Sequence, residues 1–390
     1  MTGKWHLGSG EGHLPNAHGF DRSYALDASG ADNWEHKSFM PLYPDAPWFE
    51  DGEPTRLPDD FYSSEFIVDK MVEYLETRNP TQPFFSYLAF QAIHIPVQAP
   101  REFVDKYEGV YSSGWDALRQ QRIDSARGLG LLPEDALPPQ PHPSLRAWTE
   151  LSADEQLHYE NNMMVNAAML EAMDHHIGRF VDYLDNTGEL ANTVFIITSD
   201  NGPEFNDPTA SALFRFWMSN NDYHVDNDRA GERGYMGGIG PEWASAAAVP
   251  GSLFKMYASE GSTRVPLIIS GPVANARSEF HPAFSFVTDI APTIADIAQL
   301  PPDSDTDGRS LLPLLNGERT DVYAESDPVG MEVAGNSALF KGRHKLTRNT
   351  LPHGDARWRL HDIRNDPAER NDLSATSPDL RNEMLADYER

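Results

Sequence analysis

The 390-residue sequence contains no cysteine. This absence excludes disulfide bonds, thiolate metal sites and a cysteine nucleophile within these residues. Basic side chains are also scarce, with 31 lysines and arginines against 60 aspartates and glutamates and a formal charge of −29. Because such a charge repels phosphate groups, no nucleic acid partner is expected, and an anion would need a small local cationic pocket.

Long apolar runs are missing as well. No stretch approaches the roughly 20 apolar residues of a membrane span, so none is expected. Residues 1–20 also lack the apolar segment of a signal peptide.

Short apolar runs alternate with helical patterns over most of the chain. Three runs are predicted to be strands buried on both faces: 83–90, 194–198 and 265–269. Helices are predicted over residues 64–77 and from Ser152, where Glu155 completes a capping box, toward Gly188. This alternation predicts an α/β fold with a mostly parallel central sheet flanked by helices.

The pattern changes near residue 320. Residues 338–346 have a glycine-centred turn between two short apolar runs, residues 358–363 alternate apolar with polar, and Ser377-Pro378 begins a final helix. We therefore expect a large α/β domain over residues 1–319 and a small C-terminal antiparallel sheet with one helix over residues 320–390.

Residues 101–150 are rich in proline and arginine, and residues 202–250 are rich in glycine, asparagine and aspartate. They are predicted to be surface insertions, and long loops of compact enzymes often line the substrate site.

Polar side chains follow two of the predicted strands. Asp200 and Asn201 come directly after residues 194–198, where their oxygens could hold a hard cation, although a plain Asp-Asn-Gly turn explains them equally well. His94 follows residues 83–90 and could donate a proton, although a lone histidine is more often structural.

Two lysines are candidate anion ligands. If residues 4–6 are extended, Lys4 and His6 lie on one face and suit a tetrahedral anion. Lys255 precedes a glycine-bearing segment and a predicted strand, although a solvated surface lysine is the commoner case.

The order of these elements is more specific than any one of them. The sequence resembles the sulfatase family, and bacterial arylsulfatases most, in Gly3-Lys4-Trp5-His6-Leu7-Gly8, His94-Ile95-Pro96, Ser199-Asp200-Asn201-Gly202 and Lys255 with Glu260-Gly261. Later landmarks such as Gly308-Arg309-Ser310 extend the resemblance over essentially the whole chain.

The resemblance implies an alkaline phosphatase-like fold and hydrolysis of a small aryl or carbohydrate sulfate ester by a formylglycine. It also implies roles for individual residues. Lys4 and Lys255 would hold sulfate oxygens, His94 would protonate the departing oxygen, and His6 would act as base in the release of sulfate. Asp200 and Asn201 would bind a divalent cation, with Ca²⁺ expected before Mg²⁺.

The chain departs from that family at the nucleophile. No Cys/Ser-x-Pro-x-Arg motif is present, and the nearest match, Ser326-Asp327-Pro328-Val329-Gly330, lacks the arginine. We expect an N-terminally incomplete sulfatase in which Met1 is an internal methionine and a preceding segment supplies the formylglycine and further metal ligands.

Three other functions stay open. They are an inactive pseudo-enzyme that binds sulfated ligands, a non-catalytic module that binds sulfated glycans, and a phosphodiesterase or phosphonate hydrolase of the same superfamily. Oligomeric state and localisation, whether bacterial cytoplasm or periplasm, are not predicted.

Overall fold

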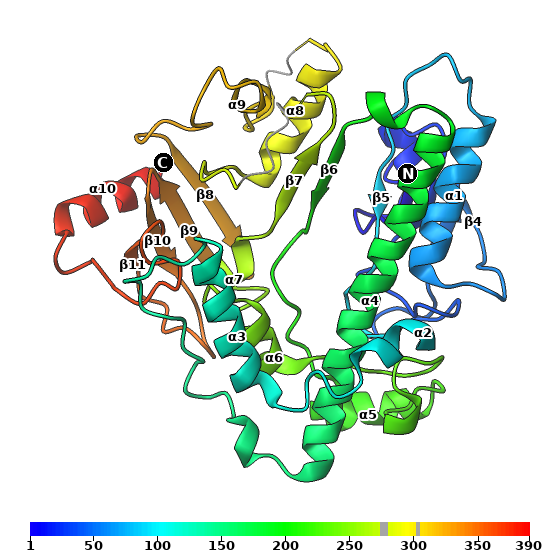
Figure 1. Ribbon diagram of the computed structural model, residues 1–390, viewed down its shortest axis with the longest axis horizontal. Helices are drawn as coiled ribbons and strands as arrows, with labels where there is room; N and C mark the ends of the chain where they lie inside the picture. The colour runs from blue at the N-terminus through cyan, green and yellow to red at the C-terminus, as the bar shows by residue number, and fades with distance from the viewer. Residues whose placement is uncertain (274–279, 302–304) are drawn as a thin grey trace. The chain divides into compact units, whose positions relative to one another are not determined.

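A computed structural model describes residues 1–273, 280–301 and 305–390. The chain divides into two compact units (Figure 1). The first unit comprises residues 1–118, 146–187 and 204–244, and the second comprises residues 119–145, 188–203 and 245–390. Helices α3 (Gly114–Gly128) and α6 (Gly240–Ala247) begin in the first unit and end in the second.

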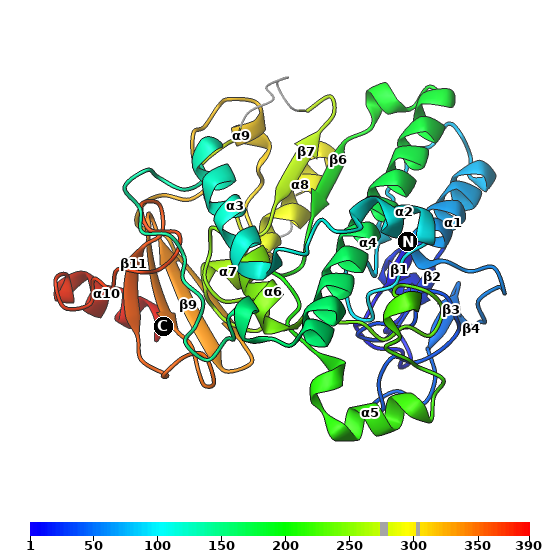
Figure 2. The same ribbon diagram turned by 60° about the horizontal axis from the view of Figure 1, so that its bottom comes forward.

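The first unit contains a five-stranded sheet in the order β4-β3-β2-β1-β5, and Figure 2 labels its strands β1 to β4. Its strands are β1 (Thr2–Lys4), β2 (Tyr24–Leu26), β3 (Trp48–Glu50), β4 (Glu53–Pro54) and β5 (Leu88–Ala89). Strand β1 pairs in parallel with β2 and with β5, whereas the β2–β3 and β3–β4 pairs are antiparallel. The carboxyl ends of β1 and β5 therefore meet at one edge of the sheet.

Two long helices form layers over this sheet: one packs on the strands, and the other packs on the first helix. The helices of the unit are α1 (Ser63–Thr77), α2 (Arg101–Val104), α4 (Ala153–Asn186) and α5 (Ala212–Ser219). Helix α1 packs on β1, where the Thr2 hydroxyl donates to the Ile67 carbonyl at 2.9 Å, and α4 runs alongside α1 (Figure 1). As predicted, Ser152 caps α4, accepting from the Glu155 amide. Among the described residues, no helix combines the length and apolar character needed to cross a bilayer.

Part of segment 202–250 is buried, which corrects its prediction as a surface insertion. Tyr235, Met236 and Trp243 are fully buried, and the Tyr235 hydroxyl donates to Asn162 on α4 at 2.6 Å. The glycines that suggested an exposed loop instead let this backbone pass between larger side chains.

The second unit contains two separate sheets. Strands β6 (Phe195–Thr198) and β7 (Leu267–Ser270) form an antiparallel pair. The C-terminal sheet has the antiparallel order β11-β10-β9-β8, with β8 (Pro328–Val333), β9 (Asn336–Lys341), β10 (His344–Arg348) and β11 (Arg359–Asp362). The helices that lie wholly within the second unit are α7 (Glu260–Thr263), α8 (Ile290–Ile297), α9 (Leu312–Leu315) and α10 (Pro378–Tyr388), in the part of the chain that the structure describes.

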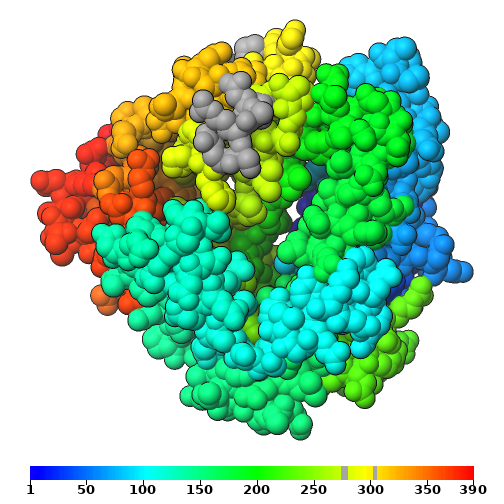
Figure 3. Space-filling view, in the orientation of Figure 1, coloured from blue at the N-terminus to red at the C-terminus, as the bar shows by residue number. Residues whose placement is uncertain are grey.

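The C-terminal sheet has its own apolar core. Leu339, Leu346, Leu360 and Met384 pack together and attach α10 to the strands. Residues 119–145 lie beside this sheet in the space-filling view, and the Arg370 guanidinium donates to the Pro138 carbonyl at 3.1 Å (Figure 3). Residues 245–319 belong to the same compact unit as this sheet. The domain division at residue 319/320 stays a prediction.

The predicted fold class is confirmed: an α/β protein with a helix-flanked sheet and a small C-terminal antiparallel sheet. Among the strands of the described residues, β1 pairs in parallel with its two neighbours, and the other strand pairs are antiparallel. The prediction of strands buried on both faces is wrong, because Phe85, Ile197 and Ile268 are all exposed. Within the described chain, β6 and β7 pair only with each other, and only Leu88–Ala89 of residues 83–90 finds a strand partner.

The buried His176 on α4 predicts a loss of stability in acid. Burial, with the nearby charges of Arg179 and His175, lowers the pKa of His176 to about 4. Arg179 donates to Nδ1 of this ring at 3.0 Å, which requires the neutral imidazole. Since an unfolded histidine titrates near pH 6.5, the stability gained from neutral His176 is complete above that pH and is lost as the pH falls toward 4.

We expect His176→Gln to flatten this dependence. The measurement is the urea midpoint at pH 7.5 and pH 5.5 for the parent chain, for His176→Gln and for His13→Gln, a histidine of the same unit whose side chain is exposed. An equal drop in midpoint for the parent chain and His176→Gln would contradict the assignment.

Candidate functional site

Lys4 and His6 lie where β1 ends. Lys4 is the last residue of the strand and is partly buried, and the Trp5 amide donates to the Leu26 carbonyl at 2.8 Å. His6 has a φ of 55° and is exposed. This left-handed turn corrects the expectation that residues 4–6 are extended, so the two-residue alternation that would place Lys4 and His6 on one face does not apply.

His94 follows β5, the parallel neighbour of β1, so its loop leaves the same sheet edge as Lys4. Its Nδ1 lies 2.8 Å from the Ile95 carbonyl oxygen, and the Phe39 ring packs edge-on against the imidazole with centroids 5.6 Å apart. The histidine is therefore held in one orientation within the first unit.

Sequence reasoning missed Glu204, which faces this histidine. Its Oε2 lies 3.5 Å from His94 Nε2, and both side chains are largely buried, 11% and 16% exposed. The signal in the sequence was a carboxylate two residues after Gly202, in the loop after a strand that was already suspected of carrying chemistry.

Asp200, Asn201 and Lys255 belong to the second unit, on two segments that interlock. The Gly202 amide donates to the Ser262 carbonyl at 2.7 Å, and the Lys255 amide donates to the Pro203 carbonyl at 3.1 Å. A Cβ at Gly202 would lie 2.0 Å from the Gly261 carbonyl oxygen, so only glycine permits this approach. The structure thus brings together the loop of the predicted metal ligands and the loop of the predicted sulfate ligand.

A buried cluster of ion pairs connects the segment that follows Lys255 to the C-terminal sheet. Lys345 on β10 is fully buried and its Nζ lies 2.8 Å from Glu260 and 3.2 Å from Glu369. Glu260 also pairs with Arg264 at 2.8 Å. Burial alone would raise the pKa of Glu260, but Lys345 and Arg264 more than offset burial and lower it.

Asp200 and Asn201 have the right kind of ligand atoms for a cation, but two residues are too few to complete a metal site. Asp200 and Asn201 offer the oxygen ligands that Ca²⁺ and Mg²⁺ prefer. Across the described ranges there is no group of three or more His, Asp or Glu side chains that could hold a metal. Because Ca²⁺ takes six to eight oxygens, these two residues are at most part of a metal site.

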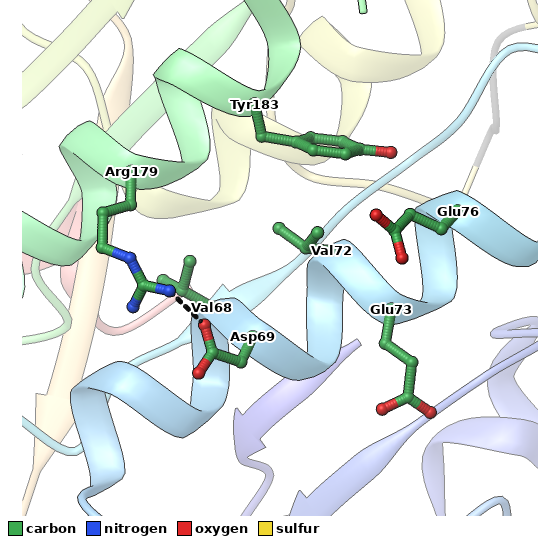
Figure 4. A pocket seen from close by; sticks show the side chains of 7 residues that line it. All are labelled: Val68, Asp69, Val72, Glu73, Glu76, Arg179 and Tyr183. Atoms are coloured by element: carbon green, nitrogen blue, oxygen red, sulfur yellow. Dashed lines mark hydrogen bonds and ion pairs between the residues drawn. The ribbon is translucent and has the colours of Figure 1, made fainter. Parts of the chain in front are cut away.

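A shallow groove of about 270 Å³ lies elsewhere, between α1 and α4 (Figure 4). It is lined by Val68, Asp69, Val72, Glu73, Glu76, Arg179 and Tyr183. None of the predicted site residues lines it, and its one cationic side chain, Arg179, is paired with Asp69 at 2.6 Å. Its three carboxylates outnumber this one cation, so the lining does not suit an anion.

Comparison with known proteins gives one consistent family. A family model described as Sulfatase matches residues 1–300, and one described as N-sulphoglucosamine sulphohydrolase, C-terminal, matches residues 251–384. An uncharacterized sulfatase of Schizosaccharomyces pombe is 33% identical, over 99% of this chain and 72% of its own length. An arylsulfatase of Klebsiella aerogenes is 31% identical, over 81% of this chain and 68% of its own length.

Solved structures agree on the fold. The structure of Ps i-CgsB in complex with k-i-k-neocarrahexaose has a TM-score of 0.67 at 19% identity and covers all of this chain and 70% of that one. The structure of BT4656 in complex with D-glucosamine-2-N,6-O-disulfate has a TM-score of 0.59 at 20% identity and covers all of this chain and 78% of that one.

Proposed function

Because the chain belongs to the sulfatase family of the alkaline phosphatase superfamily, we propose that it serves in the hydrolysis of small aryl or carbohydrate sulfate esters. The observation that carries this proposal is the interlock of the Asp200-Asn201 loop with the Lys255 loop. It brings a loop that carries two oxygen donors for a cation next to a loop that carries a lysine for an anion, and a sulfate ester requires both kinds of group.

The residues of this chain have separate roles in the proposal. Lys4 and Lys255 hold sulfate oxygens and stabilise the charge that develops on them. His94 gives a proton to the oxygen that leaves sulfur, and His6 accepts a proton when sulfate is released. These roles rest on the family resemblance at each position.

The proposed reaction needs a nucleophile and a bound cation, and these 390 residues do not supply either of them in full. Formylglycine, when present, supplies the nucleophilic hydroxyl, and it requires a Cys or Ser in a motif that these residues do not contain. The cation, Ca²⁺ or Mg²⁺, would be held in part by Asp200 and Asn201 and would neutralise charge on a sulfate oxygen. We propose that residues outside these 390 supply the nucleophile and the other metal ligands.

The test uses the protein translated from the reading frame extended upstream of the Met1 codon. Lys255→Ala is expected to lower kcat/KM for 4-nitrophenyl sulfate about 10²- to 10³-fold, because one donor to the developing charge is lost. Lys106→Ala is the matched control, since Lys106 pairs with Glu171 on the surface of the first unit. Hydrolysis of a phosphonate monoester but not of the sulfate would favour the phosphonate hydrolase instead.

A further inference from the structure

The imidazole of His94 lies between two oxygen acceptors. Nδ1 is 2.8 Å from the Ile95 carbonyl oxygen, and Nε2 is 3.5 Å from Glu204 Oε2. Since a carbonyl oxygen only accepts, this contact requires the proton on Nδ1. In the neutral ring Nε2 then carries a lone pair, and in the imidazolium it carries a proton that faces a carboxylate.

The Glu204 carboxylate is itself oriented. Its Oε1 accepts from the Phe205 amide at 3.1 Å, from the Asn206 amide at 3.1 Å and from the Asn206 side-chain amide at 2.6 Å. These three donors fix one oxygen and aim the other at His94. The pair is therefore built into the loop rather than formed by a mobile surface glutamate.

Other charged groups on the surrounding elements are engaged elsewhere. Asp32 accepts from Gln98 at 2.7 Å, and the Lys37 ammonium donates to the Asp222 carbonyl at 3.1 Å. The Phe39 ring, which is buried, packs against the His94 ring. Glu204 is a charged group that faces Nε2.

We infer that Glu204 is a positioning residue that orients the His94 ring and stabilises its imidazolium form. The inference rests on the proposed role of His94. As the S–O bond breaks, the leaving oxygen takes the bonding electron pair and the Nε2 proton, which leaves a neutral ring with Nδ1–H that solvent reprotonates. The 3.5 Å separation is longer than a strong charged hydrogen bond of about 2.7–2.9 Å, so Glu204 leaves the Nε2 proton available to substrate.

The test is a histidine NMR titration of the 390-residue chain, with the His94 signal assigned from His94→Gln. Glu204→Gln keeps the shape of the side chain and removes its charge. It is expected to lower the titration midpoint of His94 by about one pH unit, the smaller end of the effect of one nearby opposite charge. Long-range ¹H–¹⁵N spectra of the unsubstituted chain should show neutral His94 protonated on Nδ1.

The matched control is Asp45→Asn. Asp45 also lies 3.5 Å from a histidine Nε2, that of His36, but is 57% exposed, and its substitution should leave the His94 midpoint in place. A neutral His94 protonated on Nε2, or a midpoint that Glu204→Gln does not lower, would overturn the inference. Neither outcome bears on sulfate hydrolysis, which is tested on the protein translated from the reading frame extended upstream of Met1. If that protein does not hydrolyse the sulfate ester but His94 shows the expected shift, only the proposed function is overturned.

Discussion

The purified 390-residue chain is expected to release no 4-nitrophenol from 4-nitrophenyl sulfate above the buffer rate, with Ca²⁺ or Mg²⁺ present. The loss relative to an active sulfatase should be on the order of 10⁶-fold, as when a catalytic nucleophile is removed from another hydrolase. The sequence contains no cysteine. Ser326, in the nearest serine motif, leads directly into strand β8, and its neighbour Asp327 is paired with Arg309 at 2.5 Å.

The codons upstream of Met1 are the control for this prediction. An in-frame continuation that encodes Cys/Ser-x-Pro-x-Arg should confer turnover when it is expressed with the rest. Metal-dependent turnover by the 390 residues alone would show that the nucleophile lies within them, and an in-frame stop close upstream would remove the expected source of the motif.

Lys345→Met is expected to lower the free energy of unfolding by about 3–5 kcal/mol, because Glu260 and Glu369 would stay buried without their shared cation. The Lys345 ammonium is fully buried, and the two glutamates are 3% and 5% exposed. Urea unfolding at neutral pH measures the effect. Lys345→Met combined with Glu369→Gln should recover part of it, since Glu260 keeps Arg264.

Lys341→Met is the matched control from the neighbouring strand. Lys341 also contacts two carboxylates, Glu383 at 2.5 Å and Asp387 at 2.6 Å; Lys341 and Asp387 are 13% and 12% exposed, whereas Glu383 is 59% exposed. Its loss should cost less than that of Lys345, because water still reaches Lys341 and one of its two carboxylates. Equal costs for the two lysines would show that burial of the Lys345 cluster is not what stabilises the fold.

Elements with strong local signals could be predicted from the sequence. Helix α4 begins where the Ser152 capping box places it, the β9–β10 hairpin surrounds the predicted glycine turn, and α10 begins at Pro378. In each case a few adjacent residues determine the local structure.

Features that depend on distant partners could not be predicted. The hydrophobicity of residues 194–198 does not specify that β6 pairs antiparallel with β7. Lys345 stands in an alternating strand pattern like any surface lysine, and only the approach of Glu260 and Glu369 makes its burial favourable. Within the candidate site, His94 was predicted from its strand, whereas its partner Glu204 comes from a segment more than 100 residues away.

The contact between Gly202 and Gly261 also bears on the proposed reaction. Because the two loops touch backbone to backbone, the segments that carry Asp200, Asn201 and Lys255 are held together before any ligand arrives. Groups that are already in place need not reorganise as charge develops on a reacting group. The work of bringing these two loops together is thus done during folding.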